Sequence, residues 1–277
     1  MSTAFHSRNL LIAVFVVIST FATTTVRAGK PVYVGQPSAQ NVSMDQIDHA
    51  TWNAILKKYV DKDGMVNYRA LKANANDVQA LNGYIQLLST ANPNVASKRN
   101  AQLAFWINAY NAVTVHGILR VHPTTSIRNH TAKLAGYNIW HDLQLYVGGK
   151  PYSLDSMEHK ILRKMNEPRI HFAIVCASIG CPRLLNEAYT SREVANQLET
   201  NAKDFFSRSR NFRHDTANNR FYMSAIMDWF GSDFGNDQAS QLRRIAGWLP
   251  NATAQNAALQ NSVSVSHLDY DWNLNGK

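Results

Sequence analysis

The sequence predicts a mostly helical single α+β domain with a small central sheet and β-hairpins. Three observations support this prediction. Apolar residues recur at helical spacing over several long segments. Two short alternating segments surround the tight-turn residues Gly148-Gly149 and Ala217-Asn218-Asn219. The run 170–176 is apolar on both sides, which is typical of a buried central strand.

Residues 1–28 have the features of a cleavable signal peptide. Arg8 precedes an apolar run over 10–22, and Val26-Arg27-Ala28 offers small residues at the positions that a signal peptidase reads. The run is shorter than the roughly 20 residues that span a bilayer, although a retained membrane anchor stays open as the alternative. We therefore expect cleavage near Ala28, a secreted or periplasmic location, and a mature form that does not span the membrane.

The charge pattern bears on the class of partner. The formal charge is +9, and it falls to +7 when Arg8 and Arg27 leave with the signal peptide. The basic residues are scattered in short groups such as Lys57-Lys58 and Lys98-Arg99. Because a nucleic-acid-binding domain usually gathers them on one face with aromatic residues, we expect no nucleic-acid partner. A cell-envelope polymer or a peptide remains open as the partner.

The elements follow in order along the chain. Residues 29–44 form an extended leader, and 45–277 form the globular domain. Asp45 caps the first helix, and residues 60–68 form a turn into a short strand. Pro93 lies after the second helix and Pro123 after the third. Ser153 caps the fourth helix, and Pro168 ends it. Hairpins are expected over 138–152 and 211–224, and a closing strand over 263–268. The expected helices are 45–59, 74–89, 97–122, 153–165, 191–207 and 240–249.

The helix 97–122 is apolar almost all round, so we expect it to be the central buried helix. Asn108 and Asn111 interrupt its surface. A buried amide needs hydrogen-bond partners. Each asparagine therefore either clamps neighbouring main chain or orients a substrate or a catalytic histidine.

The segment 169–182 gathers the reactive groups of the chain. It holds both cysteines, Cys176 and Cys181, with His171 in the same apolar run. On a regular strand His171 and Cys176 point to opposite faces, so His171 is a poor base for Cys176. His159, which follows Glu158 one helix earlier, is the better candidate.

Four blocks of the sequence resemble a known family when taken in order. They are Phe105-Trp106-Ile107-Asn108-Ala109-Tyr110-Asn111-Ala112, Ser153-Leu154 through Glu158-His159, Arg169-Ile170-His171-Phe172-Ala173 with Cys176 through Pro182, and Tyr270-Asp271-Trp272-Asn273-Leu274-Asn275. Together they resemble the domain of unknown function 547 family over about 95–230 and the C-terminal block 261–275. With its signal peptide, the chain looks like a bacterial, exported member. The resemblance places His159, His171, Cys176 and Cys181 on motif positions without assigning their roles.

The main chemical hypothesis is a cysteine-centred hydrolase or transferase, with papain- or transglutaminase-like chemistry. A nucleophilic cysteine needs a lowered pKa, a base and a group that orients the base. We assign Cys176, His159, Glu158 and Asn108 to catalysis. Asn111, His171 and Cys181 are assigned to substrate binding.

Three other hypotheses remain for this chain: a disulfide between the two cysteines, a zinc site that includes them, and a binding domain in which the cysteines have no chemical role. In an oxidising compartment Cys176 and Cys181 would more often form a disulfide in a structural or binding domain. A zinc site built from His159, His171 and the two cysteines fits by ligand type but not by spacing. A non-enzymatic domain could bind a polymer or glycan through exposed aromatic residues. We assign no metal ligand and no cofactor, and we interpret Asp233-Phe234-Gly235 as a packing turn rather than a kinase motif.

Overall fold

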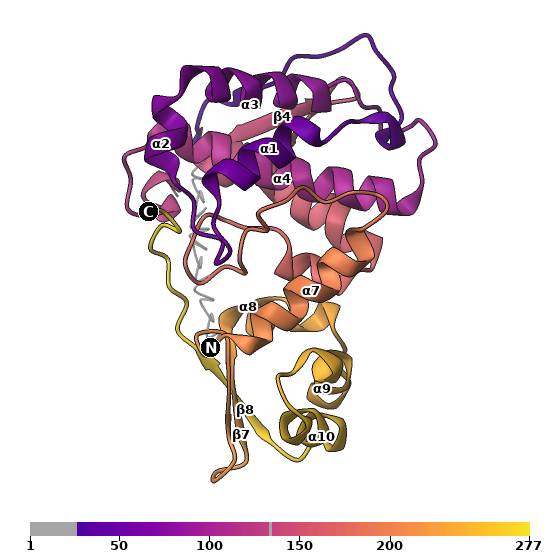
Figure 1. Ribbon diagram of the computed structural model, residues 1–277, viewed down its shortest axis with the longest axis vertical. Coiled ribbons are helices and arrows are strands. Elements are labelled where there is room, and N and C mark those ends of the chain that lie inside the picture. The colour runs from indigo at the N-terminus through magenta and orange to yellow at the C-terminus, as the bar shows by residue number, and fades with distance from the viewer. Residues whose placement is uncertain (1–26, 133–134) are drawn as a thin grey trace, which may run out of the picture.

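The computed structural model describes residues 27–132 and 135–277 (Figure 1). The predicted signal peptide lies outside the described residues, except for its last two. These two form β1 (Arg27–Ala28), which pairs in parallel with β3 (Ala135–Gly136). In the described part of the chain, none of the helices combines the length and the apolar character needed to cross a membrane.

Most of the labelled helices in the upper half of Figure 1 surround α4 (Arg99–Val121), and the strand β4 (Leu143–Val147) lies among them. Leu103, Phe105 and Ile107 on α4 are each at most 2% exposed, as expected for a helix that is apolar on every side. The helix ends at Val121 because Pro123 follows two residues later. The bounds are η1 (Met44–Gln46), α1 (Ala50–Tyr59), α2 (Tyr68–Ala73), α3 (Ala75–Leu88), α4 (Arg99–Val121), η2 (Ile127–His130) and α5 (Ile139–Asp142).

A three-stranded sheet packs beside these helices in the order β2-β4-β5. Its strands are β2 (Val32–Val34), β4 (Leu143–Val147) and β5 (Lys150–Ser153), and Val147 pairs with Lys150 across the turn. Gly148 and Gly149 have φ angles of 56° and 75°, a region that favours glycine. The predicted hairpin is confirmed.

The lower half contains a second three-stranded sheet, in the order β6-β7-β8. The β6–β7 hairpin turns through Asn219 with φ of 46°, as the asparagine-rich turn predicts. The closing strand β8 pairs in parallel with β7, which requires the long crossover through α8 to α10. The bounds are α7 (Val194–Ser207), β6 (Phe212–Asp215), β7 (Arg220–Ser224), α8 (Ala225–Trp229), η6 (Gly231–Asp233), α9 (Gln238–Ile245), η7 (Ala246–Trp248), α10 (Ala252–Gln260) and β8 (Ser264–Leu268).

The described residues form two hydrophobic cores, one in each half. The segment that leads to the cysteines runs between them. Ile170, Ala173 and Val175 pack in the upper core, whereas Phe172 packs in the lower one against Phe205 and Phe206. This position explains why the run is apolar on both sides.

The prediction of a central strand over 170–176 is wrong. Pro168–Phe172 is a 3-10 helix, η5, and the chain continues to Cys176 without a strand partner. Asparagine side chains replace the missing ladder. Asn111 donates to the Ala173 carbonyl at 3.0 Å and accepts from the Val175 amide at 2.9 Å, and Asn201 donates to the Phe172 carbonyl at 3.1 Å. A buried run is apolar whether its main-chain groups make hydrogen bonds to a neighbouring strand or to side-chain amides. Composition alone therefore does not distinguish the two, and the strand prediction rested on composition.

Candidate functional site

A pocket of about 250 Å³ opens at the seam between the two halves of the molecule. Both cysteines contribute to its surface, together with Glu158, His159 and His171. Its remaining lining residues are Tyr110, Trp140, His141, Asp155, Ile174, Pro182, Ile226, Trp229, Phe230, Tyr270 and Trp272. A larger hollow of about 440 Å³ beside α1 contains neither cysteine. The chemistry-bearing groups of the sequence therefore meet in the smaller pocket.

The loop that carries the cysteines is held by the C-terminal strap, which we define as residues 269–277. The Gly180 amide donates to the Asp271 carbonyl at 2.8 Å, and the Ile179 amide donates to the Asn273 carbonyl at 2.8 Å. A Cβ atom at Gly180 would lie 2.9 Å from the Asp271 nitrogen, so a glycine is required for this close approach. Ala177 adopts φ of 60°, a left-handed conformation that costs a non-glycine residue about 1 kcal/mol or more. The strap thus fixes a strained turn directly after Cys176.

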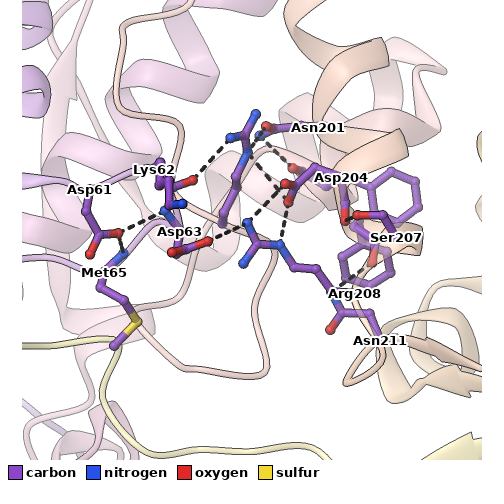
Figure 2. A network of polar contacts seen from close by, with 12 residues as sticks. Asp61, Lys62, Asp63, Met65, Asn201, Asp204, Ser207, Arg208 and Asn211 are labelled. Atoms are coloured by element: carbon purple, nitrogen blue, oxygen red, sulfur yellow. Dashed lines mark hydrogen bonds and ion pairs between the residues drawn. The ribbon is translucent and has the colours of Figure 1, made fainter.

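A polar network fixes the other end of the same loop (Figure 2). Arg183, two residues after Cys181, donates from Nε to the Asn201 Oδ1 at 3.0 Å and from a terminal nitrogen to the Lys62 carbonyl at 3.2 Å. Arg208 pairs with Asp204 at 2.7 Å and lies 3.4 Å from Asp63. The network joins α7 to the turn after α1, and so holds the loop from outside the pocket.

The two sulfur atoms lie 2.7 Å apart, and both cysteines are free. A disulfide bond is about 2.05 Å long, so in this geometry the pair stands as two thiols at a separation that a small movement would close to a bond. The Tyr270 hydroxyl lies 3.3 Å from the Cys176 sulfur and 3.0 Å from the Cys181 sulfur. The Cys176 amide donates to the Cys181 sulfur at 3.0 Å.

These contacts divide the pair into a thiolate and a thiol. Hydrogen bonding from Cys181, and then from Tyr270 and Ser178, lowers the pKa of Cys176 to about 7 despite its burial. Burial, followed by the hydrogen bond to Cys176 and then the charge of Cys176, raises the pKa of Cys181 well above its usual value. Near neutral pH the arrangement therefore favours a Cys176 thiolate with Cys181 and Tyr270 as its donors.

Glu158 and His159 lie in a π-helical turn rather than a regular α-helix. The predicted helix 153–165 is built from α6 (Leu154–Ser156), the π-helical η3 (Met157–Leu162) and the 3-10 helix η4 (Arg163–Met165). A π-turn makes i→i+5 hydrogen bonds, so adjacent side chains are separated by a smaller angle than in an α-helix, and such turns are frequent at functional sites. Both side chains line the pocket.

Burial, and after it the nearby charge of Cys176, raise the pKa of Glu158 to about 7. The Tyr110 hydroxyl donates to its Oε2 at 3.3 Å. A carboxyl group with this pKa can both give and take a proton near neutral pH.

His159 is not hydrogen-bonded to Cys176. Its Nδ1 lies 3.2 Å from an Arg163 nitrogen, and its Nε2 lies 3.8 Å from the Asp155 carboxylate. Its ring stacks beside Phe230 with the centroids 6.2 Å apart. It reaches the pocket, but the sulfur takes its hydrogen bonds from other residues.

His171 belongs to a separate polar cluster at the back of the pocket. Its Nε2 lies 2.8 Å from the Asp233 carboxylate, and Arg163 makes a two-pronged pair with the same carboxylate at 2.7 Å. Its ring stacks on Phe230 at 4.2 Å. Burial lowers the pKa of His171 to about 4, so its imidazole is neutral at pH 7.

The two asparagines of α4 lie beneath the pocket rather than in its lining. Asn108, fully buried, donates to the Tyr189 carbonyl at 2.7 Å and accepts from the Tyr189 amide at 3.0 Å. Asn111 clamps Ala173 and Val175, immediately before Cys176. Both amides bind main chain, so in this geometry Asn111 positions the cysteine loop and Asn108 holds the chain at Tyr189, beyond that loop.

Comparison with known proteins identifies the segment that contains most of this site. Residues 94–206 match the family model described as protein of unknown function, DUF547. These residues belong to the DUF547 family. No curated protein and no solved structure matches the chain.

In the DUF547 segment, the sequence blocks that carried the resemblance now have physical roles. In the first block Asn111 clamps the chain immediately before Cys176, and Asn108 clamps it at Tyr189. The block with Glu158 and His159 forms the π-helical wall of the pocket. Tyr270 lies after the matched segment and still contacts both sulfurs. Among the described residues of the DUF547 segment and its flanks, no group of three or more His, Cys, Asp or Glu side chains is arranged to hold a metal ion.

Sequence reasoning missed three contributors to the site. Tyr270 stood in a recognised block, but nothing local indicates its contact with Cys176. Asp233 belongs to the segment that we interpret as a packing turn, and that interpretation does not reveal that its carboxylate binds His171 and Arg163. Trp229 is the third contributor. Its side chain lines the pocket and is 46% exposed, and this exposure can be known only from a structure.

Replacing Glu158 with glutamine is expected to change how stability depends on pH. The folded pKa of Glu158, about 7, exceeds its ordinary value of 4.5, so its contribution to stability is full below pH 4.5 and is lost as the pH rises through 7. The difference in unfolding free energy, wild type minus Glu158→Gln, should fall by about 3 kcal/mol between pH 4.5 and pH 8. Urea unfolding at several pH values measures it.

The comparison contains its own control. His49, His116 and His171 have pKa values lowered to about 4 by burial, so each contributes in the opposite direction as the pH rises from 4 to 6.5. These groups are present in both proteins and cancel in the difference. If the difference in unfolding free energy between wild type and Glu158→Gln stays constant from pH 4.5 to pH 8, the Glu158 carboxyl has an ordinary pKa.

Proposed function

We propose that the pocket is the active site of a thiol-dependent hydrolase or transferase in which Cys176 is the nucleophile. One observation carries the proposal: the Cys176 sulfur lies in a 250 Å³ pocket, in hydrogen-bond contact with Cys181 and Tyr270, which lower its pKa to about 7. Reactive cysteines need this combination of partial access and stabilised thiolate.

The proposed reaction begins when the Cys176 thiolate attacks an acyl carbon and forms a thioester. The bond to the leaving group breaks, and Glu158, in its protonated form, gives that group a proton. Water or another nucleophile then attacks the thioester, Glu158 takes the proton of that nucleophile, and the thiolate returns to Cys181 and Tyr270. His159 lines the pocket beside this path, and its Nδ1 lies 3.2 Å from an Arg163 nitrogen outside the lining.

Acylation by p-nitrophenyl acetate tests the proposal. Reduced protein at pH 7.5 should release a burst of one p-nitrophenolate per chain and carry one acetyl group by mass spectrometry. Cys176→Ala should lose both signals, whereas Cys181→Ala should keep the acetylation at a lower rate. An undiminished burst in Cys176→Ala would overturn the assignment.

A structural disulfide is the second candidate function of the pair. The 2.7 Å contact between the sulfurs favours it, because oxidation would need little movement of the backbone. Thiol counting on the native protein before reduction separates the two proposals. A pair that is fully oxidised and resists mild reductants would remove the nucleophile, whereas two titratable thiols would remove the structural disulfide.

We also propose that the protein works outside the cytoplasm. This proposal depends on the signal peptide predicted over residues 1–28. Expression in a bacterial host with N-terminal sequencing of the exported form tests this. A mature chain that begins near residue 29 supports export, and an intact Met1 in the cytosolic fraction contradicts it.

A further inference from the structure

The mouth of the pocket has an aromatic wall that leads from the surface down to the sulfurs. Trp229 is 46% exposed, and its ring stacks near Trp272 with the centroids 5.8 Å apart and the planes inclined by 24°. Tyr270 continues the wall inward, 4.9 Å from Trp229 and 4.5 Å from Trp272. Trp140 completes the wall, 6.1 Å from Trp272. An exposed tryptophan that is surrounded by other aromatic rings at a pocket mouth is typical of a ligand-binding surface.

A carboxylate faces the same pocket. Asp155 lines it, its side chain is 34% exposed, and no donor in residues 27–132 or 135–277 makes a hydrogen bond to its oxygens. Its nearest basic groups are His141 at 3.9 Å and His159 at 3.8 Å, both beyond hydrogen-bond range. The pocket lining includes Glu158 as a second acidic group and no lysine or arginine.

The combination selects one class of ligand. An anionic group would meet the Asp155 carboxylate in a lining that holds histidines but no lysine or arginine, and a purely hydrocarbon group would remove water from a carboxylate that no donor hydrogen-bonds. A cation on an apolar stem fits both the aromatic wall and the Asp155 carboxylate. The tryptophan faces attract an ammonium group, and the carboxylate pairs with it. Trp272 already attracts one cation, the Arg128 guanidinium, which lies 5.1 Å from its ring centre and outside the pocket lining.

We infer that the outer pocket binds a primary alkylammonium group, such as a lysine side chain, and that this amine accepts the acyl group from Cys176. The inference rests on the proposed function for its reaction step. Bound as the ammonium between Asp155 and Trp229, the amine loses a proton to the Glu158 carboxylate and attacks the thioester. An amide bond forms, the thioester bond breaks, and the Cys176 thiolate is released. The second proton on the nitrogen leaves to water.

Binding is tested without chemistry, in the Cys176→Ala protein at pH 7. The probes are n-pentylamine, 1-pentanol as its uncharged counterpart, and glucose, and tryptophan fluorescence and calorimetry report binding. We expect n-pentylamine to bind and 1-pentanol to bind at least fivefold more weakly. Asp155→Asn and Trp229→Ala should each weaken amine binding about fivefold, as expected for one ion pair or one cation–π contact of roughly 1 kcal/mol.

Tyr33→Ala is the matched control, since Tyr33 is 48% exposed and lies outside the pocket lining. It should leave amine binding unchanged. Equal binding of pentylamine and pentanol, or no effect of either pocket variant, would overturn the inference. Binding of glucose without binding of the amine would replace it with a neutral sugar site.

A second measurement separates the two proposals. Wild-type protein with p-nitrophenyl acetate and n-pentylamine should form N-pentylacetamide faster than Cys176→Ala does. Acetylation of Cys176 without binding of the amine would leave the proposed function standing and remove the amine acceptor. Amine binding without acetylation of Cys176 would keep the amine-binding site and remove both the proposed function and the acyl transfer to the amine.

Discussion

Replacing Cys181 with alanine is expected to move the midpoint of the pH profile for Cys176 alkylation from about 7 toward its ordinary value of 9.0. Cys181 makes the largest contribution to the lowered pKa of Cys176, since its thiol donates to the Cys176 thiolate across 2.7 Å. Without that donor, burial disfavours the thiolate more strongly. Iodoacetamide alkylation followed by mass spectrometry across pH 5.5 to 10 measures the midpoint.

The midpoint is a better readout than the rate at a single pH. A shift from 7 to 9 lowers the thiolate fraction at pH 7 about 50-fold, but a more basic thiolate is intrinsically about eightfold more nucleophilic, so the net rate at pH 7 falls only about sixfold. Above pH 9 the variant should react faster than the wild type. This crossing of the two profiles follows from the pKa change and not from a general loss of structure.

Ser178→Ala provides the matched control for this experiment. Its hydroxyl lies 3.7 Å from the Cys176 sulfur and is a weaker contributor than Cys181 or Tyr270. Its profile should shift by a smaller amount than that of Cys181→Ala. Coincident profiles for Cys181→Ala and the wild type would show that Cys181 does not stabilise the thiolate.

Replacing Asn111 with leucine is expected to lower the free energy of unfolding by about 4 kcal/mol. Leucine has a similar size, but it leaves the Ala173 carbonyl and the Val175 amide buried without these partners, and each such group costs about 1–3 kcal/mol. The clamp lies immediately before Cys176, so alkylation of that cysteine should also change. Urea unfolding followed by circular dichroism measures the stability.

Asn256→Leu is the control for Asn111→Leu. Asn256 lies on α10, exposed to solvent, and the same substitution there should change stability by no more than about 0.5 kcal/mol. A loss at Asn111 as small as the change at Asn256 would show that the Asn111 amide is not needed to satisfy the buried main chain.

Local patterns predicted much of the fold. The helices α3, α4 and α7 and the two hairpins occur close to their expected positions, because helical spacing, Gly148-Gly149 and Ala217-Asn218-Asn219 act over a few residues. Two elements showed the limit of this approach. The alanine-rich α10 was missed, and α1 begins at Ala50 although Asp45 has the features of a cap. Asp45 instead lies in the short helix η1, which Ser43 caps.

The strand predicted over 170–176 failed for a different reason. Periodicity reports which sides of a segment are buried, and both sides are buried here because two cores meet at it. Whether the main chain then pairs with a strand or with Asn111 and Asn201 depends on residues far away in the sequence. Because this segment is not a strand, His171 and Cys176 do not point to opposite faces of a sheet, and both line one pocket.

The sequence by itself determined the reactive groups of this protein and the helices and hairpins that carry most of them, because residue chemistry and short-range periodicity are local properties. Only the tertiary structure decided that Cys181 and Tyr270, rather than His159, contact the Cys176 sulfur. It also decided that Glu158 and His159 share one wall through a π-turn, and that the C-terminal strap closes over the cysteine loop. The physical reason is that pKa values and contacts depend on distance in space, and here residues 94 positions apart in the chain set the state of one thiol.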